Sequence, residues 1–280
     1  MKRLIVTADD FGRCLPINEA VEDGHRRGVL TAASLMVAGD AALDAVQRAR
    51  ALPDLAVGLH ATLVDGRPAL PPSEIPDLVG PDGRFTKQLV RLGARIYFEK
   101  KLQAQIAAEL RAQFELYRAT GLFFDHVDSH HHYHLHPTVF AILLDLAVTF
   151  GAKAIRIPYE PPFTSLRARR DRPAHRLATG LLHWRATRAM RRAAQRAGLK
   201  TNDRLFGFAD SGAMDAYHFA DFITHLPDGI SEIYCHPATR GWPDDPMPPT
   251  YRCVDEYRAL IDPQVMRKAQ AVTLTSFGSL

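Results

Sequence analysis

Cysteine is scarce in this sequence. Cys14, Cys235 and Cys253 are the only three in 280 residues, and no two of them form a CxxC pair. An odd and widely spaced set supplies neither a disulfide framework nor a zinc site built from cysteine. The pattern favours a reducing compartment, and we expect a cytoplasmic protein.

Long apolar runs are also missing. No stretch approaches the roughly 20 apolar residues that a membrane-spanning helix needs, and the N-terminal "MKRLIVTADD" lacks the apolar core and cleavage site of a signal peptide. Charge of one sign does not dominate either, since 35 basic and 31 acidic residues leave a formal charge of +4. With 46% hydrophobic residues the chain can build a sizeable core, and we expect a single domain over residues 1–280.

Short apolar runs alternate with amphipathic segments along the whole chain. Strands are expected at 4–8, 32–37, 55–63, 123–130, 152–160, 204–209, 232–237 and 271–277, and helices at 17–28, 41–52, 87–120, 138–151, 216–226 and 254–270. This order is typical of a parallel α/β sheet, and seven or eight strands favour a distorted (β/α) barrel of the TIM type. An open, doubly wound sheet is the alternative.

The unusual polar residues fall where these strands end. They are Asp9 and Asp10 on the first strand, His60 on the third, Asp128 and His130 on the fourth, Arg156 on the fifth and His236 on the seventh. In parallel α/β folds the catalytic groups gather at the carboxyl ends of the strands. The sequence therefore predicts one site, assembled from five strands at one rim.

The adjacent carboxylates Asp9 and Asp10 repel each other unless a positive group lies beside them, so a metal ion is the first hypothesis. The structural alternative is that they accept backbone N–H bonds at the start of a helix. The "DFG" at 10–12 is not a kinase signature, because no glycine-rich loop or catalytic loop precedes it.

Six of the 13 histidines lie between His126 and His136. Residues 128 and 130 of "DHVDSH" project to the same side of a strand, so one can bind a metal while the other orients it. By the same periodicity His131 is expected to point away from the rim. Each histidine also has an ordinary structural interpretation, and His60 alone, in an apolar strand, is more typical of a core residue.

Together these residues form a resemblance to a family. "TADDFG", "GLH" at 58–60, "HVDSHHHYHLHP" at 126–137 and "CHPA" at 235–238 resemble the motifs of the YdjC-like carbohydrate deacetylases, which include chitooligosaccharide deacetylase. The resemblance implies a distorted barrel and one divalent metal, zinc or magnesium, held by Asp10, His60 and His130. Such a set leaves open coordination positions for water and substrate.

The resemblance also implies a role for Asp9, and the chemistry of deacetylation suggests candidates for three further roles. Asp9 is the expected general base. His236 is our candidate for the acid that protonates the departing amine, Asp128 for orienting a ligand, and Arg156 for an ion pair with Asp9.

Three shorter stretches narrow the expected substrate. "ASLMV" at 33–37, "GRPALPP" at 66–72 and "LTSFGSL" at 274–280 resemble the hopanoid-biosynthesis-associated branch, which implies an N-acetylglucosaminyl hopanoid. A chitooligosaccharide is the alternative substrate. Three other functions fit less well. A sugar isomerase would want additional carboxylate ligands, and a protein that only binds metal or lipid would not need Asp9. A glycoside hydrolase would use carboxylates several ångströms apart on different strands, whereas Asp9 and Asp10 are adjacent and are expected to alternate in direction.

Residues 165–200 form a basic helical insertion in this scheme. The segment carries ten arginines between Arg167 and Arg196 and only one acidic residue, Asp171. Leu177, Leu181, Trp184 and Met190 recur among them at roughly helical spacing. One interpretation is a solvated helix that packs its apolar side on the barrel; another is peripheral contact with the inner membrane. We expect no nucleic-acid partner, because no base-stacking motif is present, and no feature specifies an oligomeric state.

Overall fold

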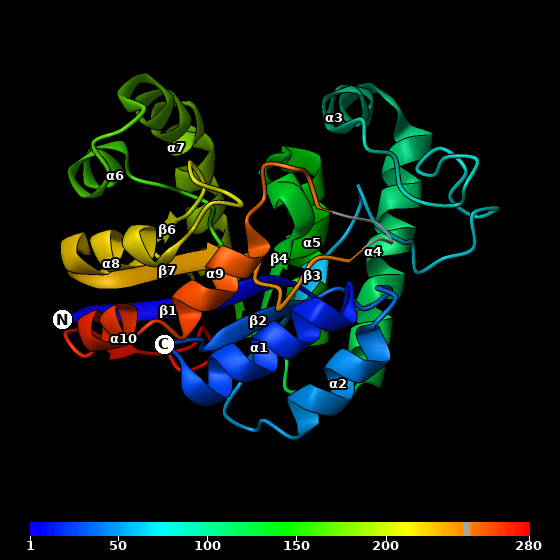
Figure 1. Cartoon of the computed structure of the whole chain (residues 1–280). Helices are drawn as coiled ribbons and strands as arrows, with labels where there is room; N and C mark the ends of the chain where they lie inside the picture. Colours follow the sequence, from blue (N-terminus) through cyan, green and yellow to red (C-terminus); the bar gives the residue numbers. More distant parts are fainter. Residues whose placement is uncertain (243–246) are drawn as a thin grey trace.

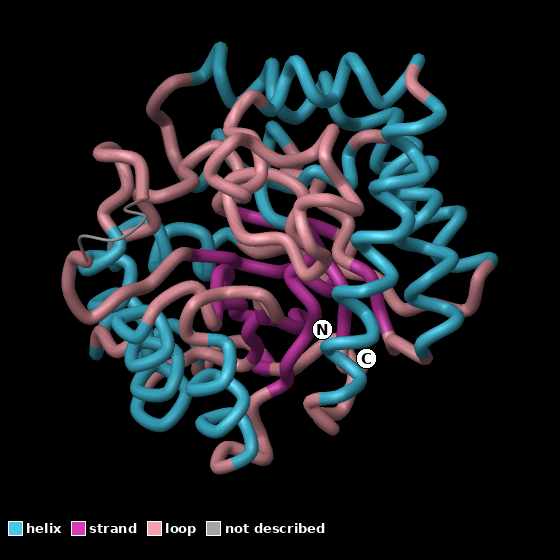
Figure 2. Tube along the Cα trace, turned by 90° about the vertical axis from the view of Figure 1, so that its right-hand side faces the viewer, coloured by secondary structure: helices cyan, strands magenta, loops and turns pink. Residues whose placement is uncertain are grey.

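Parallel strands form one curled sheet in the centre of the molecule, and helices surround it (Figures 1 and 2). The computed structural model describes residues 1–242 and 247–280. The strands are β1 (Lys2–Phe11), β2 (Ala32–Leu35), β3 (Ala56–Ala61), β4 (His126–Ser129), β5 (Ala154–Ile155), β6 (Arg204–Phe206), β7 (Gly229–Cys235) and β8 (Thr273–Leu274). Seven of them follow the order β5-β4-β3-β2-β1-β7-β6, and β8 pairs with the start of β1.

Strand β1 lies inside the sheet and not at an edge. It pairs in parallel with β2 on one side and with β7 on the other, and every residue from Leu4 to Phe11 is buried. A parallel strand covered on both faces requires a continuous apolar run, which explains "LIVTA" and places Asp9 and Asp10 inside the fold rather than at its surface.

The sheet is a curled half-barrel whose two edges approach each other without forming a ladder. Each edge strand bonds a segment next to the other one: the Ile155 N–H of β5 donates to the Lys200 carbonyl before β6, and the Leu205 N–H of β6 donates to the Tyr159 carbonyl after β5. The Asn202 side chain bonds both the N–H and the carbonyl of Ile157. The expectation of a distorted α/β barrel is therefore confirmed in the form of a curled half-barrel, and the consecutive order from β5 to β1 differs from that of a doubly wound sheet.

The helices are α1 (Leu15–Arg27), α2 (Ala42–Arg50), α3 (Leu89–Phe98), α4 (Lys100–Ala119), α5 (Pro137–Phe150), α6 (Pro162–Ala168), α7 (Pro173–Arg196), α8 (Ala216–His225), α9 (Cys253–Leu260) and α10 (Pro263–Ala269), with a 3-10 helix η1 at His130–Leu135. In Figure 1, α6 and α7 project on one side of the sheet and α3 on the other. None of the described helices is long and apolar enough to cross a membrane.

Three expected elements differ in detail. The helix expected over 87–120 is two helices, because Glu99 takes an extended conformation between α3 and α4. The fifth strand has only two residues, so Arg156 follows it rather than lying within it. The helix expected over 254–270 also divides, where Asp262 caps α10 by accepting bonds from the Gln264 and Val265 N–H groups.

Helix α7 does not bury one apolar stripe. Met190 is 6% exposed and packs inward, whereas Leu181 is 63% and Trp184 is 46% exposed. Residue 190 lies on a different side of the helix from residues 181 and 184 at 3.6 residues per turn. The interpretation of these residues as one packed face is therefore wrong.

Candidate functional site

The carboxyl ends of the strands bring all seven predicted site residues together. Strand β1 carries Asp9 and Asp10, β3 carries His60 and β4 carries Asp128, while His130, Arg156 and His236 directly follow β4, β5 and β7. All seven are at least nine-tenths buried. A buried set of this kind needs compensating partners inside the fold, since buried charges are paired or bound to metal.

Three nitrogen and oxygen atoms converge within this set. Asp10 Oδ1 lies 2.9 Å from His130 Nδ1 and 3.3 Å from His60 Nε2, and the two nitrogens are 3.3 Å apart. Ligands bound to a tetrahedral ion at about 2.0–2.2 Å stand about 3.3 Å from one another. Both carboxylate oxygens of Asp10 are buried and accept no hydrogen bond from the described residues. These three residues can hold a divalent metal ion.

Sheet register fixes the orientation of His60. Asp128 is its direct neighbour in the pairing of β3 with β4, and its Oδ1 lies 2.8 Å from His60 Nδ1. That contact turns His60 Nε2 toward Asp10. A carboxylate behind a metal-binding histidine orients the ring in the same way. Gly58 of the "GLH" motif makes room for this arrangement, because a Cβ there would lie 2.5 Å from the His126 ring.

The charge of Asp9 is paired with that of a buried arginine. The Arg156 guanidinium donates two parallel bonds of 2.8 Å to the two Asp9 oxygens and also contacts Asp128. On its other side it donates to Glu232 Oε1 at 2.8 and 3.0 Å. Burial raises the pKa of Glu232, and the Arg156 charge opposes that rise. One arginine thus holds three carboxylates, and Glu232 is a member that the sequence analysis missed, although a glutamate inside the apolar "GISEIYC" signals a buried partner.

Asp9 and Asp10 do not alternate in direction as adjacent strand residues normally do. Asp10 has a φ of 65°, and the pairing of β1 with β2 shifts register between Ala8 and Phe11. Oxygen atoms of both aspartates consequently lie near His60, each in a cluster whose members are within 4.8 Å of one another. The left-handed backbone, rare for a residue with a Cβ, allows both carboxylates to face one site.

Protonated histidine balances the charge of Asp10 when no metal is bound. Burial alone would raise the pKa of Asp10, but His130 and His60 hold it well below its usual range. Burial would likewise lower the pKa of His60, yet Asp128, Asp9 and Asp10 raise it to about 10. A metal ion must displace these protons, so metal binding here is coupled to proton release.

The histidine cluster divides into two groups. His126 stacks on Phe277, His134 bonds Ser129 Oγ and the Arg156 carbonyl, and His136 caps α5, so these three serve the fold. His130, His131 and His132 all line one cavity. The expectation that His131 points away is wrong, because the strand ends at Ser129 and residues 131 and 132 take left-handed conformations, with φ of 55° and 50°.

The cavity over the site has a volume of about 230 Å³. Aromatic rings form much of its wall, since Phe208 stacks on His132 with ring centroids 5.0 Å apart, and Tyr234 and Tyr251 lie on either side of His236. Cavities that bind small ligands combine such apolar walls with a few polar groups. This one has room for a small group such as a single sugar ring.

His236 lines the same cavity, close to a buried carboxyl group. Burial lowers the pKa of His236 to about 4, so its ring is neutral at pH 7. Glu256 Oε2 accepts a bond from the His236 backbone N–H and lies 3.9 Å from Nδ1 of the ring. Burial also raises the pKa of Glu256, to about 7. The sequence analysis missed Glu256, which lies in a helix 20 residues after His236.

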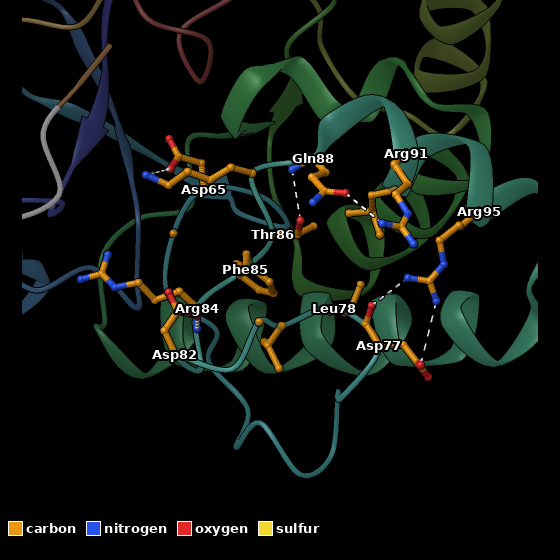
Figure 3. A pocket seen from close by; sticks show the side chains of 15 residues that line it. Asp65, Asp77, Leu78, Asp82, Arg84, Phe85, Thr86, Gln88, Arg91 and Arg95 are labelled. Atoms are coloured by element: carbon orange, nitrogen blue, oxygen red, sulfur yellow. Dashed lines mark hydrogen bonds and ion pairs between the residues drawn. The ribbon is translucent and has the colours of Figure 1, made fainter. Parts of the chain in front are cut away.

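Asp65 connects the site to a second cavity, of about 710 Å³, which is formed mainly by residues 77–95 (Figure 3). Its carboxylate lies 3.6 Å from His131 Nε2 and 3.8 Å from His130 Nε2, and Lys87 pairs with it at 3.1 Å. Charges of both signs line the second cavity, among them Asp77, Arg84 and Arg95. Asp65 was also missed, because nothing in "LVDGRP" suggests a residue at the rim.

Comparison with known proteins gives matches over nearly the whole chain. It is 31% identical to a carbohydrate deacetylase of Geobacillus stearothermophilus, over 99% of this chain and 98% of that protein. It is 32% identical to one of Mus musculus, over 90% and 81%. A carbohydrate deacetylase of Brevibacillus brevis is 37% identical, but the match spans only 58% of this chain and 60% of that protein.

A solved structure shares the fold. A protein of Enterococcus faecalis V583, described as a candidate for cellobiose-phosphate cleavage, superposes with a TM-score of 0.74 at 24% identity, over 99% of this chain and 97% of that one. The model of the family described as "YdjC-like protein" matches residues 3–271. This protein therefore belongs to the YdjC-like family.

Proposed function

We propose that this protein is a metal-dependent carbohydrate deacetylase that removes the N-acetyl group from an N-acetylglucosamine-type sugar. Relatives that it matches over most of their length are carbohydrate deacetylases. The observation that carries the proposal is the convergence of Asp10, His60 and His130 beside a second carboxylate, Asp9, which accepts bonds from an arginine instead. A protein that only binds metal has no use for Asp9 in that position.

Asp10, His60 and His130 would hold one divalent ion, zinc or magnesium. When bound, such an ion polarises the amide carbonyl and lowers the pKa of a water molecule from about 16 toward 7. These nitrogen and oxygen ligands do not show which of the two metals binds, because geometry and metal availability determine the bound metal as much as ligand type does.

Asp9 is the proposed general base. It takes a proton from water while the water oxygen forms a bond to the carbonyl carbon, and the two bonds from Arg156 hold its carboxylate in place. The carbon–nitrogen bond then breaks, acetate leaves, and the sugar nitrogen takes a proton to leave as an amine. Arg156 has no exposed surface and acts as a positioning residue through Asp9.

His236 is the proposed donor of the proton to the nitrogen. Because its ring is neutral before the reaction, the proton must reach it during turnover. The Glu256 carboxyl lies 3.9 Å from Nδ1, and burial raises its pKa to about 7, so it can hold a proton for His236 near neutral pH. We therefore assign Glu256 two roles, which are to supply a proton to His236 and to position its ring.

An N-acetylglucosaminyl hopanoid is the proposed substrate. Its support is the resemblance of 33–37, 66–72 and 274–280 to the hopanoid-associated branch, and a cavity of about 230 Å³ that accepts one sugar ring while a large attached group extends outside. Within 274–280, Phe277 stacks on His126 at the start of β4, so this motif seals the opposite end of the barrel from the cavity. The second candidate is a chitooligosaccharide, the substrate implied by the family as a whole.

The deciding experiment measures acetate release from N-acetylglucosaminyl hopanoid and from N,N'-diacetylchitobiose. The enzyme is stripped of metal, and each divalent ion is restored in turn. Release from the hopanoid alone would support the complete proposal, and release from the disaccharide alone would retain the chemistry and reject the lipid substrate. Absence of acetate with both substrates and every ion would refute the deacetylase assignment to these substrates.

A further inference from the structure

Helix α7 has a strongly basic outer side. Its 24 residues include no aspartate or glutamate, and its inner side packs against the molecule through buried positions such as Gly180, Met190 and Ala194. The opposite side exposes four arginines and three large apolar residues. We call this set the α7 outer face: Leu181, Leu182, Trp184, Arg185, Arg188, Arg192 and Arg196.

The arginines of the α7 outer face are not neutralised by nearby acids. In the same helix Arg176 pairs with Asp210 at 2.8 Å, and Arg191 donates to the Asp203 carbonyl. By contrast, none of the four outer arginines forms an ion pair with a carboxylate of residues 1–242 or 247–280. Helical geometry places these four within about one third of the circumference. Their charge is therefore available to an external anion.

The exposed leucines favour a lipid surface over other anionic partners. Leu181 is 63% and Leu182 is 76% exposed, and both lie among the arginines. At a membrane surface such residues leave water for the boundary of the acyl chains while arginines contact anionic headgroups. The exposed leucines would bury no apolar surface against a nucleic acid. The Arg188 guanidinium lies over the Trp184 ring, 5.9 Å from its centroid, so this ring offers no free face on which a base could stack.

The inner side of α7 reaches the wall of the candidate site. His183 of α7 packs on Phe208, with ring centroids 5.4 Å apart, and Phe208 stacks on His132 in the wall of the cavity. Figure 1 shows α7 projecting with α6 on one side of the sheet. A membrane bound to the α7 outer face would therefore lie one helix diameter, about 10 Å, from the cavity wall.

We propose that the α7 outer face binds the surface of anionic membranes and holds the cavity next to the lipid. The binding itself is independent of catalysis. The purpose of this binding, which is to bring a lipid-linked amino sugar to the cavity, rests on the proposed function. Because the attraction is between exposed charges, it must weaken as salt rises.

The test is co-sedimentation of the full chain with vesicles of phosphatidylcholine alone or with 30% phosphatidylserine. The main variant carries Arg185→Gln, Arg188→Gln, Arg192→Gln and Arg196→Gln. A matched control removes four other positive charges: Arg50→Gln, Arg111→Gln, Arg258→Gln and Arg267→Gln. A second variant, L181S with L182S, removes the apolar part, and a duplex DNA of equal charge concentration is the competing ligand.

We expect the wild type to bind only the anionic vesicles. Binding of the main variant should be at least tenfold weaker, and binding of the control should stay within twofold of the wild type. The leucine variant should lose most of its binding at 0.5 M salt. No binding to anionic vesicles, equal loss in the control, or tighter binding to DNA would overturn the proposal. D9N must bind vesicles normally, and the main variant must still release acetate at the wild-type rate from the same substrate dispersed in detergent without vesicles. Failure of the deacetylase assignment is therefore distinguishable from failure of the membrane proposal.

Discussion

The adjacent carboxylates provide a sharp test, because Asp9→Asn and Asp10→Asn change the same atoms in neighbouring residues with different expected results. Asp9 is bonded to Arg156 and lies outside the Asp10, His60 and His130 set. D9N should therefore keep the metal and lose the base. A general base contributes about 10²–10⁴ in rate, so acetate release should fall by that factor, about 3–5 kcal/mol in activation free energy.

The stability of D9N should change only moderately. The amide oxygen of the substituted side chain remains as one acceptor for Arg156, and the guanidinium keeps Glu232 and Asp128 as partners. Since bonds to charged groups contribute about 1.5–3 kcal/mol each, we expect a loss of roughly 2 kcal/mol in urea-induced unfolding. A D9N protein that is fully folded and inactive separates catalysis from folding.

D10N should lose the metal itself. Metal that binds only the folded state stabilises it by about 4 kcal/mol at a thousandfold excess over Kd, so added zinc should raise the Tm of the wild type and of D9N but hardly that of D10N. Mass spectrometry of the metal content after dialysis should likewise find metal in the wild type and in D9N but hardly any in D10N. The reasoning is refuted if D9N retains activity within threefold, or if D9N loses the metal and D10N keeps it.

Three further predictions concern the groups around this pair. Arg156→Met leaves a cluster of buried carboxylates without a cation, so the free energy of unfolding should fall by about 3–5 kcal/mol; a loss under 1 kcal/mol in urea would contradict the network. Glu256→Gln should lower kcat and remove the decline in kcat above pH 7 that deprotonation of Glu256 produces, and an unchanged alkaline limb would exclude it as the proton source for His236. Burial lowers the pKa of His134 to about 4. The unfolded chain therefore binds this proton first, and stability present above pH 6.5 is lost as pH falls toward 4, by about 3 kcal/mol for this group. Ring signals of His134 that titrate near 6.5 in an NMR experiment would disprove it.

The sequence by itself determined the architecture and the rim at which the seven candidate residues meet. Alternating apolar and amphipathic segments specify parallel strands crossed by helices, and parallel strands deliver their last residues to one rim. Because that rule depends only on where a strand ends, Asp9, Asp10, His60 and His236 could be assigned to one site without a structure.

Tertiary structure decided which charges meet. Glu232 and Glu256 were not predicted, because they lie far along the chain from Asp9 and His236 and their contacts depend on sheet register and helix packing. Likewise, periodicity placed His131 away from the site, but a left-handed turn at 131 and 132 returned it to the cavity. Backbone conformation at single residues is set by the packing around them, and a pattern of residue types does not record it. The same holds for Asp10, whose left-handed conformation lets two like charges face one site, each beside a different cation.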